Sequence, residues 1–475
     1  MAITLQLLYI VLWAVYIVSV VGSIIVMLSE NRNPIRSLAW VIALIFLPVV
    51  GVIFYLFLGR SPKVQHMMNR RSKRRIASAV KTERVDLDAL SLPPQQKLLV
   101  KLASSLSFSP LTVHNTLDIY SEGSAKFDAL KEDLRRAESS IYLQYYIFSD
   151  DETGREIASI LKEKARAGVT VKVIYDHVGS FSAHNRFFRD MRRAGVDVHP
   201  FFRVTFPQLA NRINWRNHRK IVVIDGRVGY IGGMNIASRY LRGQEGRVWR
   251  DTHFRVTGEI VKSLLASFAL DWSFMNQSLE NLPPLPEVTV PSTVLGMQLV
   301  TSGPTDPWHS LSLCFLKAIS SARKCVYIQT PYFLPTEALL EALQTAALAQ
   351  VDVRVMIPRV SDSKVIRYAS FSYVTQLLNA GIKVYLYEPG MLHSKNMIID
   401  DDLVTSGSTN FDFRSFENNF ESNLFIYSRR ANESMRSIFF ADMKECRKVT
   451  LSEWHHRPLF QRFMESTVRL LAPIL

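Results

Sequence analysis

Cysteine is scarce in this chain, and so are the usual metal-binding patterns. Three of the 475 residues are cysteines without paired spacing, namely Cys314, Cys325 and Cys446. A sparse, odd set of this kind indicates a reducing compartment and argues against a disulfide framework. The sequence contains neither C-x-x-C nor H-E-x-x-H, spacings at which thiols or imidazoles hold zinc. We therefore expect no metal and no other cofactor.

Charge is missing from two long stretches near the N-terminus. Residues 1–29 contain no charged side chain, and residues 37–59 contain none either. Each stretch is long enough to cross a bilayer, which takes about 20 residues. A cleaved signal peptide is the ordinary alternative for the first stretch, but it lacks a basic start and a second apolar run follows at once. We expect a transmembrane hairpin over residues 1–59, with spans at about 3–28 and 37–59.

Acidic residues are the minority, with 42 Asp and Glu against 57 Lys and Arg and a net charge of +15. This excess suits an anionic partner, either a nucleic acid or an anionic membrane. Basic residues cluster directly after the second apolar stretch: Arg60, Lys63, Arg70, Arg71, Lys73, Arg74 and Arg75. The positive-inside rule places such a cluster on the cytoplasmic side, where it also attracts anionic headgroups. We expect a multi-pass protein of the cell (inner) membrane whose catalytic body faces the cytoplasm.

One motif, H-x-K-x4-D-x6-G-x-x-N, occurs twice. The first copy comprises His218, Lys220, Asp225, Gly232 and Asn235, and the second comprises His393, Lys395, Asp400, Gly407 and Asn410. A single copy could arise by chance, because short motifs have high false-positive rates. Two copies with the same internal spacing indicate a duplicated fold that brings two His/Lys pairs to one site.

The repeat extends beyond the motif and predicts the fold class. Residues 141–144 (IYLQ) are echoed by 326–329 (VYIQ), and 194–196 (AGV) by 380–382 (AGI). Runs rich in Val, Ile and Tyr predict buried strands at 141–147, 169–175, 221–224, 326–329, 353–357 and 396–399. Helical patterns end just before Ile141 and cover 336–349. This alternation predicts two homologous α/β halves with mixed sheets covered by helices.

Breaks in composition predict the domain boundaries. Residues 60–112 are expected to form a basic tether and connector, and 113–280 the first half. Four prolines between positions 283 and 291 mark a linker, so 281–475 comprises that linker, the second half and a C-terminal amphipathic tail. The tail, from 449, mixes large apolar residues with arginine. Both an interfacial helix and a helix packed on the body remain open for it.

Two His/Lys pairs suit displacement at a phosphodiester. Side chains two apart on a strand share a face, so each histidine should point the same way as its lysine. One imidazole can attack phosphorus while the other protonates the leaving oxygen and deprotonates the incoming one. The lysines, with Asn235 and Asn410, would hold the nonbridging oxygens. Asp225 and Asp400 have the opposite parity at the end of each strand, which favours a structural role over substrate contact.

The two motifs resemble the two HKD motifs of the phospholipase D superfamily. The resemblance implies two α/β halves related by a pseudo-twofold axis, an active site at their interface and a phosphatidyl-histidine intermediate. It implies a catalytic set of His218, Lys220, Asp225, His393, Lys395 and Asp400. Residues expected to bind phosphate or to support the histidines are Asn235, Asn410, Ser408, Glu421 and Asp251. By analogy His218 would be the nucleophile and His393 the acid/base. One departure is Gly233, where the superfamily usually has serine, as at Ser408.

Other segments narrow the resemblance to the bacterial cardiolipin synthase family. They are 33–40 (NPIRSLAW), 47–51 (LPVVG), 58–60 (LGR), 302–304 (SGP) and 410–416 (NFDFRSF). This resemblance implies transfer of a phosphatidyl group between two phosphatidylglycerol molecules, giving cardiolipin and glycerol. The expected partners are phosphatidylglycerol and anionic membrane lipids, without nucleic acid, and the oligomeric state is left open. The alternatives are a hydrolytic membrane phospholipase D and, less favoured, a membrane-tethered phosphodiesterase or nuclease.

Overall fold

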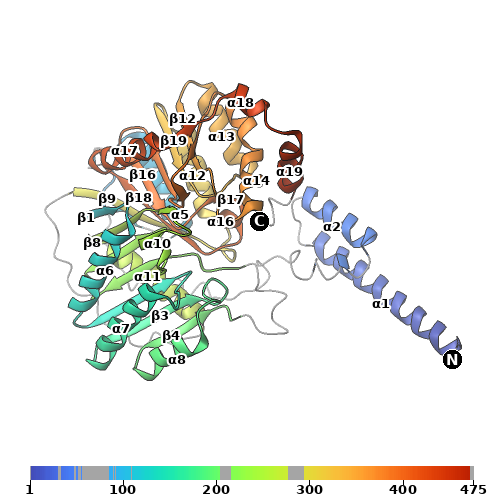
Figure 1. Cartoon of the computed structure of the whole chain (residues 1–475), viewed down its shortest axis with the longest axis horizontal. Coiled ribbons are helices and arrows are strands. Elements are labelled where there is room, and N and C mark those ends of the chain that lie inside the picture. The colour runs from blue at the N-terminus through green and yellow to red at the C-terminus, as the bar shows by residue number, and fades with distance from the viewer. Residues whose placement is uncertain are drawn as a thin grey trace. The chain divides into compact units, whose positions relative to one another are not determined.

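The structure is a computed structural model that describes residues 2–29, 34–47, 50–51, 55, 85–88, 90, 92–107, 110–203, 215–275 and 294–470. These residues form an N-terminal helical pair and an α/β body (Figure 1). The seven basic residues at 60–75 lie outside the described part of the chain.

The uncharged N-terminal stretches form helices α1 (Ala2–Ser29) and α2 (Pro34–Phe46), which pack against each other. The hydroxyl of Tyr16 donates a hydrogen bond of 2.7 Å to the carbonyl of Leu44, and Val20 is buried beside it. Residues 4–25 of α1 are long and apolar enough to cross a bilayer. The first predicted span is therefore a continuous helix. The second, 37–59, begins within α2, and most of its remainder falls outside the described residues.

The body is built on a mixed sheet whose strand order is mirrored about its centre. The order is β19-β13-β12-β10-β15-β16-β18-β9-β1-β8-β6-β5-β2-β3-β4. The central strands β1 (Thr112–Tyr120) and β9 (Val294–Ser302) are antiparallel. Outward from β1 the chain contributes β8, β6, β5, β2, β3 and β4, and outward from β9 the corresponding β18, β16, β15, β10, β12 and β13. The two halves thus repeat one strand order.

The predicted strands are confirmed within two residues at their ends. In the first half the strands are β2 (Ser140–Tyr145), β3 (Thr170–Asp176), β4 (Asp197–Phe201), β5 (Ile221–Ile224), β6 (Val228–Gly232) and β8 (His253–Gly258). In the second half they are β10 (Cys325–Gln329), β12 (Asp352–Pro358), β13 (Lys383–Tyr387), β15 (Asn396–Ile399), β16 (Leu403–Gly407), β18 (Glu421–Tyr427) and β19 (Cys446–Lys448). Parallel pairs and antiparallel pairs both occur, as expected for a mixed sheet.

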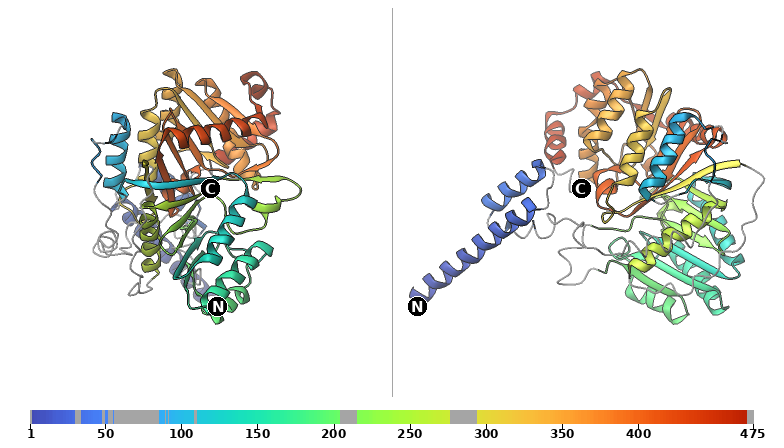
Figure 2. Two further views of the ribbon diagram at one scale, coloured as in Figure 1. Left: turned by 90° about the vertical axis from the view of Figure 1, so that its left-hand side faces the viewer. Right: turned by 180° about the vertical axis from the view of Figure 1, so that it is seen from behind.

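Helices cover both faces of the sheet (Figures 1 and 2). One face of the first half packs against α6 (Gly123–Arg136), α7 (Glu152–Arg166) and α8 (Asn185–Arg193). In the second half the matching helices are α12 (Ser310–Ser320), α13 (Glu337–Leu348), α14 (Lys364–Ser372) and α15 (Val374–Asn379). The other face carries α11 (Ile260–Phe274) and α17 (Arg429–Lys444), whose Phe268 and Phe439 belong to one core shared by both halves. This shared core joins the halves through apolar burial.

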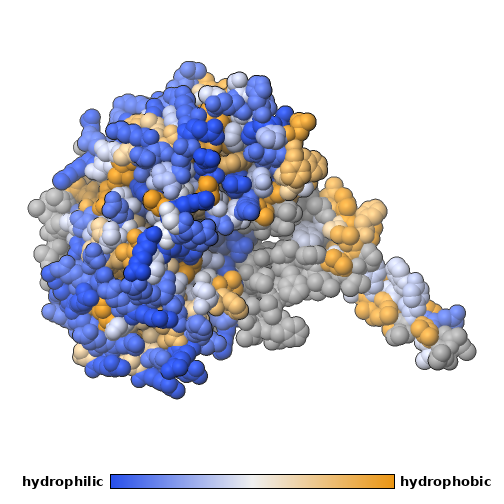
Figure 3. All heavy atoms as spheres, in the orientation of Figure 1, coloured by the Kyte–Doolittle hydropathy of each residue, from blue (hydrophilic) through white to orange (hydrophobic). Residues whose placement is uncertain are grey.

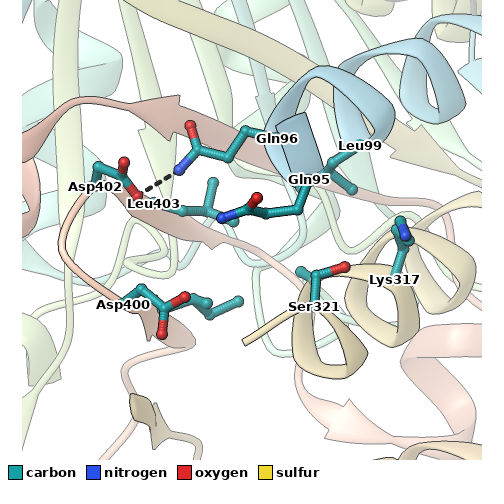
Figure 4. A pocket seen from close by; sticks show the side chains of 10 residues that line it. Gln95, Gln96, Leu99, Lys317, Ser321, Asp400, Asp402 and Leu403 are labelled. Carbon is teal, nitrogen blue, oxygen red and sulfur yellow. Dashed lines mark hydrogen bonds between the residues drawn. The ribbon is translucent and has the colours of Figure 1, made fainter. Parts of the chain in front are cut away.

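The connector and the tail both pack on the second half. Helix α5 (Pro94–Ser107) lies against α12 and β9, and the Gln96 amide donates a hydrogen bond to Asp402 (Figure 4). The tail forms α18 (Leu451–His455) and α19 (Leu459–Arg469), with α19 beside α14. Val468 of α19 is buried against the body. The tail is therefore a packed helix, although the opposite face of α19 is exposed and apolar.

Candidate active site

The two motif histidines occupy the same place in their halves, just before β5 and just before β15. Next to His218, Asn217 forms a parallel bridge with Phe420 of the second half. Next to His393, β14 (Gly390–Leu392) pairs in parallel with β7 (Val248–Arg250) of the first half. Each histidine-bearing segment is therefore held beside a segment of the opposite half, which continues into an acidic residue.

Those acidic residues contact the histidines, and the contacts cross between halves. Nδ1 of His218 lies 3.0 Å from Oε1 of Glu421, and Nδ1 of His393 lies 2.6 Å from Oδ2 of Asp251. The backbone repeats the crossing, since the His218 N–H donates to the Phe420 carbonyl at 2.9 Å and the His393 N–H to the Arg250 carbonyl at 2.6 Å. For the two motif histidines, therefore, neither half supplies both the imidazole and its carboxylate partner.

Burial makes both imidazoles neutral at pH 7. Loss of hydration lowers the pKa of His218 to about 4, an effect that Glu421 opposes and Lys220 reinforces. Burial likewise lowers the pKa of His393, with Lys395 acting in the same direction and Asp251 against it. A neutral imidazole that donates its Nδ1 proton to a carboxylate keeps a lone pair on Nε2. Each crossed pair therefore fixes a tautomer with a nucleophilic or basic Nε2.

The acidic partners remain ionised. Burial alone would raise the pKa of Glu421, but His218 and Lys220 outweigh it and hold that pKa below its usual range. For Asp251, Lys395 and His393 similarly outweigh burial and lower the pKa. Each imidazole thus faces a carboxylate that can stabilise its protonated form.

The two lysines are fully buried beside their histidines. Nζ of Lys220 donates to the His218 carbonyl at 2.6 Å, and Nζ of Lys395 lies 2.8 Å from Nδ1 of His393. Burial lowers the pKa of Lys395 to about 8 and lowers that of Lys220 as well. Lys395 also lowers the pKa of His218, in the other half. The two motifs therefore lie within electrostatic reach of one another.

Aromatic rings flank both imidazoles. The centroid of the Tyr146 ring is 4.9 Å from that of His218, and the Trp249 ring is 5.6 Å from His393. Tyr240 also lies against His393, at 6.0 Å, and accepts a hydrogen bond of 2.8 Å from Nδ2 of Asn235. These rings restrict how each imidazole can rotate.

The two motif asparagines differ in their surroundings. Asn235 is occupied at both ends of its amide, since Oδ1 accepts from the Ile147 N–H at 3.1 Å and Nδ2 donates to Tyr240. Oδ1 of Asn410 is buried and has no hydrogen-bond partner within the described ranges. Asn235 therefore orders the first-half wall of the site, whereas Asn410 keeps a carbonyl oxygen that could accept a hydrogen bond from a ligand.

The serine-to-glycine difference between the two motifs has a steric cause. The Ser408 hydroxyl donates to the carboxylate of Glu421. At the matching Gly233, an added Cβ would lie 2.1 Å from Oδ1 of Asp251. Asp251 has a shorter side chain than Glu421. Its Oδ1, which also accepts from the Thr252 N–H at 2.7 Å, occupies the space that a serine side chain at 233 would need. Glycine at 233 is thus coupled to aspartate at 251.

Asp225 and Asp400 lie at the other end of the motif strands from the histidines. The Asp225 carboxylate accepts from three successive N–H groups, those of residues 138–140, at 2.8–2.9 Å. Asp400 does the same for residues 323–325, at 2.7–3.1 Å. Seven extended residues span roughly 20 Å, so neither aspartate can contact a ligand held by the histidines. A small pocket beside Asp400 is lined by Gln95 and Lys317 (Figure 4).

Two aspartates that belong to no sequence motif, the buried Asp271 and the partly buried Asp442, also support the site. Asp271 on α11 accepts from Arg219 at 2.6 Å and from Gln144, and Asp442 on α17 accepts from Arg250 at 2.9 Å. Gln329, the echo of Gln144, donates to Asp442 at 2.7 Å. Both arginines also donate to the backbone carbonyls of the acidic partners, Glu421 and Asp251. The IYLQ/VYIQ echo was the available sequence signal for this support.

Comparisons with known proteins agree with this geometry. The family described as "Cardiolipin synthase, PLD-like domain" matches residues 130–272 and 315–443, and "Phospholipase_D-nuclease N-terminal" matches 11–60. The chain is 37% identical over 471 residues to the major cardiolipin synthase of Bacillus subtilis, covering 97% of this chain and 98% of that one. It is 37% identical over 463 residues to the cardiolipin synthase of Geobacillus kaustophilus, covering 96% and 92%.

A solved structure shares the fold. The phosphatidylserine synthase of Haemophilus influenzae superposes with a TM-score of 0.61 at 15% identity, covering 80% of this chain and 100% of that one. Two α/β halves that cross their histidines and carboxylates define a phospholipase D-type phosphatidyltransferase. Within that class, the chain belongs to the bacterial cardiolipin synthase family. Its apolar α1 and the match over 11–60 mark it as membrane-associated.

Proposed function

We propose that the enzyme moves a phosphatidyl group from one phosphatidylglycerol to a second, giving cardiolipin and glycerol. The observation that carries the proposal is the pair of crossed contacts, His218 with Glu421 and His393 with Asp251. They supply two imidazoles with fixed tautomers at one buried, cationic site, which two successive displacements at phosphorus require.

In the first displacement, Nε2 of His218 attacks the phosphorus of the donor lipid. A P–N bond forms as the bond between phosphorus and the glycerol oxygen breaks. His393 gives its Nε2 proton to that oxygen, and glycerol leaves. The anionic phosphate raises the pKa of His393 on binding, so the imidazole carries a proton at this stage. Glu421 stabilises the positive charge that develops on His218.

In the second displacement, a terminal hydroxyl of the acceptor phosphatidylglycerol enters where glycerol left. His393, now neutral, takes the hydroxyl proton as the oxygen attacks phosphorus. The P–N bond breaks, cardiolipin is released, and His218 and His393 return to their starting states. One glycerol is formed for each cardiolipin.

The buried lysines supply the positive charge that the phosphate needs. Lys220 and Lys395 are anchored by the carbonyls of His218 and His393, so their ammonium groups are held in place before substrate binds. Fixed cations in a site with little water stabilise negative charge on nonbridging oxygens more strongly than solvated ones do. Oδ1 of Asn410 is an acceptor, so it can receive a hydrogen bond from a hydroxyl of the lipid headgroup rather than from these oxygens.

Hydrolysis is the outcome that the test must exclude. Water could replace the second lipid as acceptor, because the covalent intermediate would be the same. The full chain in vesicles of headgroup-labelled phosphatidylglycerol should release labelled glycerol and cardiolipin in equal amounts, measured by mass spectrometry. Phosphatidic acid as the main product would assign a hydrolytic phospholipase D instead.

The proposed topology places both ends of the helical pair on the cytoplasmic side. The apolar α1 and the basic residues that follow the second uncharged stretch support it. A fluorescent protein fused after Leu475 should fold and fluoresce in the cytoplasm. An alkaline phosphatase fused at the same place should be inactive, and an active fusion would reverse the orientation.

A further inference from the structure

A groove of about 340 Å³ opens on the second half, away from the motif residues. It lies among α14, α18, α19 and the strands β13 and β19, and its lining includes Arg359, Arg367, Arg447, Arg457, Trp454 and Phe460. One carboxylate, that of Glu453, lies in the same lining. Four guanidinium groups against one carboxylate give the groove a positive charge.

Several nitrogen donors in this lining have no acceptor. Nε of Arg367, Nε of Arg457 and Nε1 of Trp454 are buried and without a hydrogen-bond partner among the residues that the structure describes. Buried donors are nearly always paired in folded proteins, because an unpaired one has lost its water without compensation. Three in one groove indicate that an acceptor-rich ligand belongs there.

The arginines differ in how firmly the protein already holds them. Arg457 is fixed, since its Cζ lies 3.6 Å from the Trp454 ring centroid and Nη2 donates to Glu465 at 2.6 Å. Arg359 pairs with Glu388 at 3.1 Å. For Arg367 and Arg447, no acidic partner occurs within the described part of the chain. A bidentate anion such as a phosphate is the group that such guanidinium forks bind best.

An exposed apolar face continues from the groove. Phe460 lines the groove and is 74% exposed, and its α19 neighbours Leu459 and Phe463 are 78% and 66% exposed. Figure 3 shows apolar side chains gathered at this surface of α19. Large apolar residues beside arginines are typical of a helix that lies in the headgroup region of a bilayer.

We propose that this groove binds the phosphate of an anionic phospholipid while α19 rests in the membrane interface. Arg367 and Arg447 hold the phosphate, and the acyl chains pass along Phe460 and Phe463 into the bilayer. A free phosphate ion would satisfy the arginines but would leave the apolar face of α19 in water. The site goes beyond the transfer reaction, because none of its residues belongs to either motif.

The test uses the full chain in phosphatidylcholine nanodiscs, with photoreactive p-benzoylphenylalanine in place of Phe460. Phosphatidic acid is the added anionic lipid, because it carries no alcohol that the transfer reaction could release. Lipids attached after irradiation are counted by mass spectrometry. The proposal expects phosphatidic acid to be captured in preference to phosphatidylcholine. The double variant Arg367→Gln/Arg447→Gln should lower that capture about tenfold, since each basic contact near a membrane adds measurably to anionic-lipid binding.

The control variant Arg189→Gln/Arg430→Gln removes two exposed arginines elsewhere and should leave capture unchanged. Thermal unfolding identifies any variant that fails to fold, and the single variants Arg367→Gln and Arg447→Gln then replace the double one. Equal capture of both lipids, or full capture by the folded arginine variants, overturns the proposal. Displacement of phosphatidic acid by millimolar inorganic phosphate would also overturn it, because the groove would then bind the free ion.

Discussion

Glu421 lies 3.0 Å from Nδ1 of His218, across 203 positions of the chain and across the boundary between the two halves. Asp251 makes the reciprocal contact with His393, so each half supplies the carboxylate for the other half's imidazole. The catalytic unit is therefore a property of the assembled pair. A half expressed alone would carry a histidine without its partner.

The first prediction concerns the two imidazoles. His218→Ala and His393→Ala should each reduce cardiolipin formation about a thousandfold or more, because the two residues act as one unit. The double variant should be little worse than either single one. Turnover would be measured in phosphatidylglycerol vesicles, with chelator present. Substantial turnover by either folded single variant would end the two-imidazole mechanism.

The second prediction concerns the crossed carboxylates. Glu421→Gln and Asp251→Asn remove the charge that holds each Nδ1 proton, and each should lower kcat by about a hundredfold to ten-thousandfold. The affinity for substrate should change less, since neither carboxylate is expected to bind phosphate. Glu433→Gln, which removes an exposed carboxylate on α17, is the matched control. If the crossed variants kept wild-type kcat, these contacts would be structural only.

The third prediction separates Asp400 from the chemistry. Asp400→Asn weakens the acceptor for the three N–H groups of residues 323–325, so we expect a loss of about 1–3 kcal/mol in unfolding free energy. Turnover per folded molecule should stay within a few-fold of the wild type. Asp401→Asn, on the same turn, removes no backbone contact among the described residues but weakens two ion pairs, with Lys324 and at 3.6 Å with Arg436, and should cost about 1 kcal/mol or less. A large fall in kcat with unchanged stability would return Asp400 to the catalytic set.

The fourth prediction is that restoring the usual motif serine does harm. Gly233→Ser places a Cβ where Oδ1 of Asp251 lies, and this displaces the carboxylate that holds His393. A misplacement of about 1 Å can cost roughly a hundredfold in rate, and we expect a loss of that order. The reciprocal Ser408→Gly removes one hydrogen bond to Glu421 and should cost less. Wild-type activity in Gly233→Ser would show that Asp251 can move without consequence.

The fifth prediction concerns pH. Burial lowers the pKa of His218 from 6.5 to about 4, so the unfolded chain binds more protons between those values than the folded chain does. Stability from this residue is fully present above pH 6.5 and is lost as the pH falls toward 4. The unfolding midpoint of the wild type should drop more between pH 7 and pH 5 than that of His218→Asn. The exposed His455→Asn is the control and should follow the wild type, and identical pH profiles for all three proteins would contradict the shift.

Local pattern was sufficient for much of the fold. Alternation of Val- and Ile-rich runs with helical periodicities placed strands such as 221–224 and 396–399 at their observed ends, because buried strands need continuous apolar side chains. The duplicated motif also led to the repeated strand order. The two-residue spacing of His and Lys predicted a shared face, and Lys395 does lie beside His393.

Other features depend on contacts between distant segments. No spacing rule connects Asp271 to Arg219 or Asp442 to Arg250, since α11 reaches Arg219 by packing on the strands of the first half and α17 reaches Arg250 across the boundary between the halves. The sequence likewise does not explain why residue 233 is glycine, because Asp251 comes close to it only through the pairing of β6 with β8.

The sequence by itself determined that this protein has two copies of one H-x-K-x4-D-x6-G-x-x-N motif and an uncharged stretch long enough to span a membrane. Both properties can be recognised in the sequence because each depends only on the types of residues at neighbouring positions. Only the tertiary structure decided that Glu421 belongs to His218 and Asp251 to His393. Those pairings follow from the joining of the two halves through the β1–β9 strand pair and one shared apolar core, and neither of these contacts can be read from the spacing of either motif.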